Sequence, residues 1–97
     1  MIRFFITYDT PADPEAFDRH YQEVHMPLAR QLPGLVDYTV VRAPRTVRGD
    51  AYYQVAELTW PDWDSAQAAF ASPKGRATAA DMVNLDAPTR SCLYEVP

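Results

Sequence analysis

The sequence predicts an α+β domain with the element order βαββαβ, the split βαβ arrangement of ferredoxin-like folds. Two observations lead to this fold class. Four short segments are rich in the β-branched and aromatic residues of strands, and two longer segments between them space apolar residues as helices do. Because no linker, repeat or low-complexity tract divides the chain, we expect a single domain, residues 1–97. Its four strands would form one antiparallel sheet with both helices on the same face.

The first strand is predicted at residues 2–8, where apolar and aromatic residues precede a turn at Asp9-Thr10-Pro11. A helix follows, because Asp13-Pro14-Glu15 supplies an N-cap, a first-turn proline and an acidic first turn. Pro33-Gly34 ends that helix near Leu32. On a regular α-helix the buried stripe would contain Phe17, Tyr21, Val24, Leu28 and Leu32.

Both histidines of the protein, His20 and His25, lie on this first helix. Five residues of α-helix turn them about 140° apart, whereas two histidines that share a metal ion from one helix are about four residues apart. We therefore expect each histidine to act alone, without a metal site. Pro27 lacks an N–H and its ring meets the carbonyl of Glu23, so the helix should bend or break just after His25. His25 then either borders a cavity or lies at the edge of the core, hydrogen-bonded to a carbonyl.

The later elements follow from the same signals. Residues 35–42 form the second strand, and the face on which Tyr38 lies stays open because both faces are largely apolar. The arginine-containing segment 43–50 is predicted to be an exposed hairpin loop. We then expect a third strand at 51–60, a helix at 62–71, its continuation at 74–84 after a fresh cap at Ser72-Pro73, and a fourth strand at 91–96.

Two acidic residues interrupt these apolar patterns. Glu57, in the third strand, is either a buried partner for a ligand or for His20, or a residue on a strand face beside a wet groove. Asp81, among the alanines of the last helical segment, either faces inward to orient a ligand or an arginine, or lies at the surface.

Composition restricts the classes of function. The formal net charge is −4 and the basic residues are scattered, which disfavours a nucleic-acid or membrane partner. The apolar run at the N-terminus is too short for a signal peptide or a membrane span. Cys92 is the single cysteine, which excludes an internal disulfide and fits a reducing compartment, and its apolar strand predicts a buried, inert thiol. We therefore expect a cytoplasmic protein.

The predicted sheet also has a consequence for assembly. With both helices on one face, the apolar side chains of the other face remain uncovered. Packing the sheets of two copies face to face would bury them, so we expect a homodimer.

Seven motifs occur in order along nearly the whole chain: Phe17-Asp18-Arg19-His20-Tyr21, Val24-His25-Met26-Pro27-Leu28-Ala29, Leu32-Pro33-Gly34-Leu35, Tyr38, Ala71-Ser72-Pro73, Gly75-Arg76-Ala77 and Ala80-Asp81. As a set they resemble the EthD-like family of dimeric α+β barrel proteins. The resemblance implies a ferredoxin-like protomer, a dimer whose two sheets form a barrel, and a pocket in each subunit between sheet and helices.

Relatives on this fold include cofactor-independent methylmuconolactone methylisomerases, quinone-forming monooxygenases, polyketide cyclases and haem-degrading enzymes. The resemblance is strongest to the histidine–tyrosine pair of the methylisomerase type, which corresponds here to His25 and Tyr38. This chain departs from that type at the third strand, which has no cysteine; Cys92 lies on the fourth.

The chemistry of these side chains indicates a hypothesis for function. Neutral imidazole takes and returns a proton near pH 7, so His25 would be the general base and acid. The phenol of Tyr38 would donate a hydrogen bond to a carbonyl oxygen on which negative charge develops. Together they suit isomerisation, cyclisation, dehydration or cofactor-free oxygenation of a flat, hydrophobic aromatic, polyketide-like or lactone substrate. The residues expected to bind it are Tyr8, Tyr21, Trp60, Phe70, Asp81 and His20.

Two other functions remain open. One is a non-catalytic dimeric binding or accessory protein for a hydrophobic metabolite. The other is a haem-binding relative, because one histidine, either His25 or His20, is enough for an axial ligand. The sequence has no glycine-rich phosphate loop, metal-ligand cluster or Gly-x-Ser-x-Gly elbow, so we expect the chemistry to need no cofactor.

Overall fold

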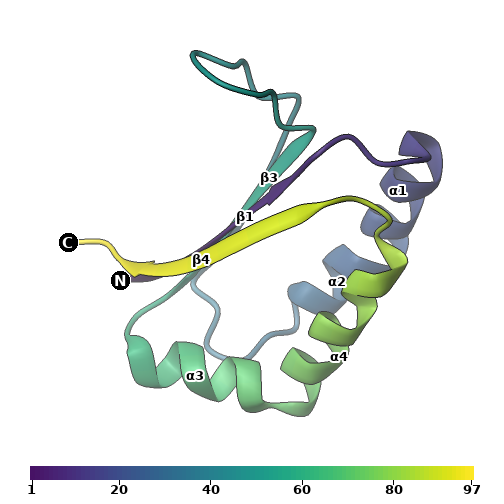
Figure 1. The fold of residues 1–97 in the computed structure, drawn as a ribbon. Helices are drawn as coiled ribbons and strands as arrows, with labels where there is room; N and C mark the ends of the chain where they lie inside the picture. Colours follow the sequence, from purple (N-terminus) through teal and green to yellow (C-terminus); the bar gives the residue numbers. More distant parts are fainter.

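The computed structural model describes residues 1–97 and contains one four-stranded antiparallel sheet in the order β2-β3-β1-β4. Its strands are β1 (Ile2–Tyr8), β2 (Asp37–Arg42), β3 (Gln54–Trp60) and β4 (Thr89–Glu95). All helices cover one face of this sheet (Figure 1). The predicted βαββαβ fold is therefore confirmed, with β2 and β3 two or three residues shorter at their starts than predicted and β4 two residues earlier.

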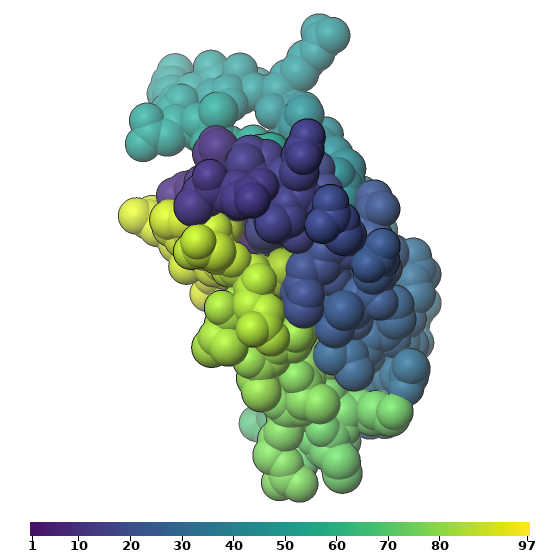
Figure 2. Space-filling model, turned by 90° about the vertical axis from the view of Figure 1, so that its right-hand side faces the viewer, coloured from purple at the N-terminus to yellow at the C-terminus, as the bar shows by residue number.

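The helices form two continuous stretches. The first comprises α1 (Pro14–His20), η1 (Tyr21–His25) and α2 (Met26–Ala29), and the second comprises α3 (Trp63–Ala71), α4 (Pro73–Asp81) and the short 3₁₀ turn η2 (Met82–Asn84). Their N-termini are capped as the sequence indicated: the carboxylates of Asp13 and Asp62 and the hydroxyl of Ser72 accept backbone N–H groups. Figure 2 shows the first stretch beside α4 on the helical face of the molecule.

The segment η1 is a π-helical turn, and it replaces the break that Pro27 was expected to cause. The N–H of Met26 bonds the carbonyl of Tyr21, five residues back, so the helix widens without stopping. The additional residue in this turn shifts the buried stripe, which now contains Phe17, Tyr21, His25, Ala29 and Leu32. The expectation that Val24 and Leu28 belong to the stripe was wrong: Val24 is 40% exposed and Leu28 is only half-buried.

The core lies between the helices and the inner face of the sheet. It contains Ile2, Ile6, Tyr8, Phe17, Tyr21, Ala29, Leu32, Ala56, Leu58, Trp60, Ala66, Ala69 and Leu85. At the corner between α3 and α4, Gly75 approaches the preceding helix closely: a Cβ there would lie 2.0 Å from the carbonyl oxygen of Ala69. Only glycine allows this approach, which brings α4 over the sheet.

No helix of this chain lies on the outer face of the sheet (Figure 1), although Thr7, Val55 and Thr59 on that face are buried. Strand alternation places Glu57 and Cys92 on this face, each beside Phe5 of β1. Glu57 is therefore separated from His20 by the sheet, which excludes a pairing of the two and leaves the other alternative, a residue on a strand face. The thiol of Cys92 is exposed in the single chain, not buried, because its strand forms the sheet edge and its side chain points outward.

None of the helices is long and apolar enough to cross a bilayer.

Candidate active site

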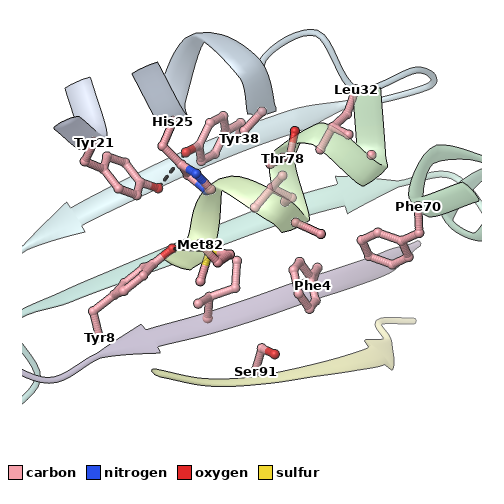
Figure 3. A pocket seen from close by; sticks show the side chains of 15 residues that line it. Phe4, Tyr8, Tyr21, His25, Leu32, Tyr38, Phe70, Thr78, Met82 and Ser91 are labelled. Carbon is pink, nitrogen blue, oxygen red and sulfur yellow. Dashed lines mark hydrogen bonds between the residues drawn. The ribbon is translucent and has the colours of Figure 1, made fainter. Parts of the chain in front are cut away.

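A cavity of about 230 Å³ lies between the inner face of the sheet and the helices α2 and α4. Eleven of its fifteen lining residues are hydrophobic, and Figure 3 shows Tyr21, Tyr38 and His25 gathered at one part of it and Phe4 and Phe70 at another. Its lining residues are Phe4, Ile6, Tyr8, Tyr21, His25, Ala29, Leu32, Tyr38, Leu58, Phe70, Gly75, Thr78, Ala79, Met82 and Ser91. Among these only Ala79 on α4 and Ser91 on β4 are exposed.

The π-turn directs His25 into this cavity. His25 is only 4% exposed, and its Nδ1 atom lies 3.0 Å from Oδ2 of Asp81, which is at the end of α4. The second ring nitrogen, Nε2, has no hydrogen-bond partner within the chain. One nitrogen is therefore held by the protein and the other is available to a ligand.

The Asp81 carboxylate has three hydrogen-bond partners. Besides His25, it accepts from Nε2 of His20, at 2.8 and 3.0 Å from its two oxygens, and from Nδ2 of Asn84 at 3.0 Å. Burial by itself would raise the pKa of Asp81, but the hydrogen bonds from Asn84, His20 and His25 outweigh it and hold the pKa below its usual range. The carboxylate is therefore ionised at neutral pH.

The pKa of His25 is lowered from its ordinary value, chiefly because burial disfavours the imidazolium. The hydrogen bond and the charge of Asp81 oppose this effect without cancelling it, and the charge of His20 adds to it. His25 is therefore neutral at pH 7 and has a lone pair with which to accept a proton.

Three tyrosines border the same part of the cavity. The hydroxyl oxygens of Tyr21 and Tyr38 are 2.6 Å apart, and the ring of Tyr8 packs edge-to-face on Tyr21 (Figure 3). Burial raises the pKa of all three phenols, so they stay protonated at neutral pH. Within the Tyr21–Tyr38 pair one hydroxyl donates to the other, and the accepting hydroxyl keeps its own proton to donate to a ligand.

Tyr38 faces the cavity, which answers the question that the sequence left open. The register pairs it with Leu58 of β3, and both residues point to the helical side of the sheet. On that side the guanidinium of Arg30 lies 5.5 Å from the centre of the Tyr38 ring.

Five of the eight residues expected in the site line the cavity: His25, Tyr38, Tyr8, Tyr21 and Phe70. The other three, Trp60, Asp81 and His20, do not. Trp60 is fully buried behind Phe70, and its indole N–H donates to the carbonyl of Pro33. Asp81 faces inward, one of its two proposed placements, but it bonds the histidines and not an arginine.

Sequence reasoning missed several lining residues, notably Phe4, Thr78, Met82 and Ser91. Strand alternation offered one signal, since Phe4 and Tyr8 share a face of β1. The others depended on where α4 crosses the sheet, which no local pattern specifies. No group of three histidine, cysteine or acidic side chains is arranged to hold a metal ion.

Comparison with known proteins relates the chain to one family. The family model of the EthD domain matches residues 9–88. An uncharacterized 11.0 kDa protein of the thcB–thcC intergenic region of Rhodococcus erythropolis is 38% identical over 86 residues, which cover 87% of this chain and 82% of that protein.

Two solved structures show the same fold. An EthD family protein from Bacillus halodurans superimposes with a TM-score of 0.89 at 30% identity, covering 100% of this chain and 99% of that one. SnoaB, a cofactor-independent oxygenase from Streptomyces nogalater, superimposes with a TM-score of 0.68 at 21% identity, covering 98% of this chain and 91% of its own.

Proposed function

This chain belongs to the EthD family, and from that premise we propose that its cavity is the active site of a cofactor-independent enzyme that acts on a small hydrophobic molecule. The observation that carries the proposal is the meeting of a free imidazole nitrogen, Nε2 of His25, with the hydroxyl pair of Tyr21 and Tyr38 in one largely apolar cavity. Such a cavity, with a few polar groups that converge, is typical of small-molecule sites.

The proposed chemistry is proton transfer beside a carbonyl group. His25 Nε2 takes a proton from the carbon next to the carbonyl; the C–H bond breaks, an N–H bond forms, and the electron pair moves onto the carbonyl oxygen. The phenol of Tyr38 donates a hydrogen bond to that oxygen and stabilises its charge. When the imidazolium returns the proton to another carbon of the substrate, the result is isomerisation. When the enolate carbon instead attacks a second carbonyl carbon of the substrate, a ring C–C bond forms and the imidazolium protonates the new alkoxide, which is cyclisation. When a hydroxyl group on the adjacent carbon leaves, its C–O bond breaks and the imidazolium supplies the proton that completes water, which is dehydration.

The cavity volume limits the size of the substrate. An apolar cavity of about 150 Å³ holds one benzene molecule, and the cavity here is about 230 Å³. It therefore suits a substituted single ring or a two-ring aromatic ketone or lactone, within the polyketide-like class. A four-ring macrocycle such as haem requires a much larger cavity, which weighs against the haem-binding alternative.

Cofactor-free oxygenation is a second candidate on the same residues. SnoaB, which shares the fold, is described as a cofactor-independent oxygenase. Removal of a proton by His25 would leave an electron-rich substrate anion, and molecular oxygen would be the co-reactant that oxidises it.

The experiment that tests the proposal detects proton transfer directly. A panel of small aromatic ketones and lactones is incubated with the protein in D₂O, and exchange of the C–H next to each carbonyl is followed by NMR. We expect exchange of at least one bound compound, and His25→Gln should slow it by about 100-fold or more. Glu23→Gln, an exposed change in the same turn, is the matched control and should not alter exchange.

Two outcomes would contradict the enzyme. Equal exchange rates in the wild type and His25→Gln would remove His25 from the mechanism. Binding of compounds without exchange of any of them would favour the binding or accessory protein instead, and in that case His25→Gln should leave the affinity nearly unchanged.

A further inference from the structure

We propose that Asp81 and His20 are positioning residues of this site: Asp81 fixes the tautomer of His25 that leaves Nε2 free in the cavity, and His20 holds the Asp81 carboxylate in place from the solvent side. The inference rests on the proposed function of His25 as the base. Its main readout nevertheless requires no substrate, so it can fail separately.

The π-turn makes this arrangement possible. On a regular α-helix His20 and His25 would point about 140° apart, and one carboxylate would not reach both. An i→i+5 turn brings residues five apart toward the same side. Both imidazoles accordingly lie within 3.0 Å of Asp81.

The charge state of Asp81 determines the tautomer of His25. An ionised carboxylate can only accept hydrogen bonds, and the bonds that Asp81 accepts keep it ionised. The Nδ1 of His25 must therefore carry the proton that it donates to Oδ2, and the lone pair of the neutral ring is on Nε2. Free histidine in water prefers the opposite tautomer, so the protein imposes this one.

His20 completes the arrangement on the outside. Its side chain is 27% exposed, whereas those of His25 and Asp81 are 6% and 8% exposed. The Nε2–H of His20 spans both carboxylate oxygens, and Asn84 adds a donor to Oδ1. These donors orient the carboxylate toward His25 and shield it from water.

The other groups around His25 do not compete for this role. The remaining titratable side chains facing it, from β1, η1 and β2, are the phenols of Tyr8, Tyr21 and Tyr38, which burial keeps neutral. The guanidinium of Arg30 lies over the Tyr38 ring, and no hydrogen bond joins it to Asp81.

The test determines the tautomer of His25 by long-range ¹H–¹⁵N NMR of the ¹⁵N-labelled protein at alkaline pH. The wild type should show a protonated Nδ1 and an unprotonated Nε2 for His25. Asp81→Asn should shift His25 toward the Nε2–H form, and His20→Leu should shift it less, because Asn84 alone then holds the carboxylate. His20→Gln, whose amide can still donate to the carboxylate, should keep most of the wild-type pattern.

A wild-type His25 protonated on Nε2 would overturn the proposal without the need for any variant. So would an unchanged Nδ1–H pattern in both Asp81→Asn and His20→Leu, provided that the backbone spectrum shows each variant folded. For a compound that exchanges, His20→Leu should slow exchange by up to about 100-fold, the usual effect of a misplaced catalytic group, and His20→Gln should restore most of the rate. Failure of every compound to exchange would contradict the catalytic role and leave the tautomer result standing.

Discussion

The hydroxyl oxygens of Tyr21 and Tyr38, from a π-turn and from the neighbouring strand, lie 2.6 Å apart at the wall of a largely apolar cavity. One of the two phenols uses its O–H in the hydrogen bond between them, so the O–H of the other is free to donate. An oxygen atom of a ligand bound in the cavity beside His25 would accept that hydrogen bond.

Removal of the Tyr38 hydroxyl should impair catalysis more than folding. Tyr38→Phe should slow the C–H exchange of a responsive compound by about 100-fold, the usual effect of losing one donor to a developing oxyanion. Its affinity for the compound should change little. Tyr53→Phe is the matched control, because the Tyr53 hydroxyl donates to Asp18 and does not line the cavity. Comparable losses in the two variants would argue against an oxyanion role for Tyr38.

Acid should weaken the fold through His25. Its folded-state pKa lies below the ordinary value of 6.5, chiefly because of burial. As the pH falls below 6.5, the unfolded chain binds a proton at this residue before the folded chain does, so the free energy of unfolding decreases until the folded-state pKa is passed. Above 6.5 the contribution is constant. Urea unfolding across this window should show the decrease in the wild type and a flatter curve for His25→Gln.

Ionisation of Asp81 also makes the free energy of unfolding decrease on acidification, but at lower pH than His25 does. The folded-state pKa of Asp81 is below the ordinary 3.8, so its contribution is present above that value and is lost as the pH falls through the folded-state pKa. The Asp81 effect begins near pH 3.8, whereas the His25 effect begins near pH 6.5. An identical pH dependence of the free energy of unfolding for His25→Gln and the wild type as the pH falls below 6.5 would show that burial of His25 does not disfavour its cation.

Gly75→Ala should destabilise the protein although alanine is the better helix former. Helix propensity alone would stabilise the variant by about 1 kcal/mol. The new methyl group, however, would lie 2.0 Å from the Ala69 carbonyl oxygen and 2.7 Å from that of Phe70, so α3 and α4 must separate. We expect a net loss of about 1–3 kcal/mol in the free energy of unfolding. Arg76→Ala, the next residue and exposed, should change it by less than about 0.5 kcal/mol.

The uncovered outer face should join two copies of the chain. Sedimentation at micromolar concentration should give a dimer, and Phe5→Lys, at the centre of that face, should give a folded monomer. Cys92 provides an independent probe, because its thiol is exposed in the single chain and on the same face. Thiol labelling should be slow in the dimer and fast in Phe5→Lys. A monomeric wild type with rapid labelling would contradict sheet-to-sheet association.

The sequence was sufficient for the element order because each element has local signals. The caps at Asp13 and Ser72 and the Pro33-Gly34 stop act within a few residues. The side of the sheet on which Tyr38 lies was not accessible, since it depends on the pairing of β2 with β3 across a loop. The exposure of Cys92 was likewise determined by which strand occupies the sheet edge.

The site was half predictable for the same reason. Pro27 correctly indicated an irregular helix beside His25. The missing N–H of proline and the clash of its ring can, however, be accommodated either by a break in the helix or by a widened turn, and the local sequence does not distinguish the two. The buried positions of Tyr21 and His25, fixed by contacts across the fold, select the widened turn. The partnership of the two histidines with Asp81 followed from that choice and was invisible before it.

The π-turn also has a consequence for chain length. A homologue with one residue fewer between Tyr21 and His25 would carry the same buried side chains at intervals of four, three, four and three, the spacing of an unbroken α-helix. Its two histidines would then be four residues apart and still on one side. An insertion or deletion here would thus leave the cavity wall intact, and two proteins that differ by it would present equivalent histidines at unequal sequence spacing.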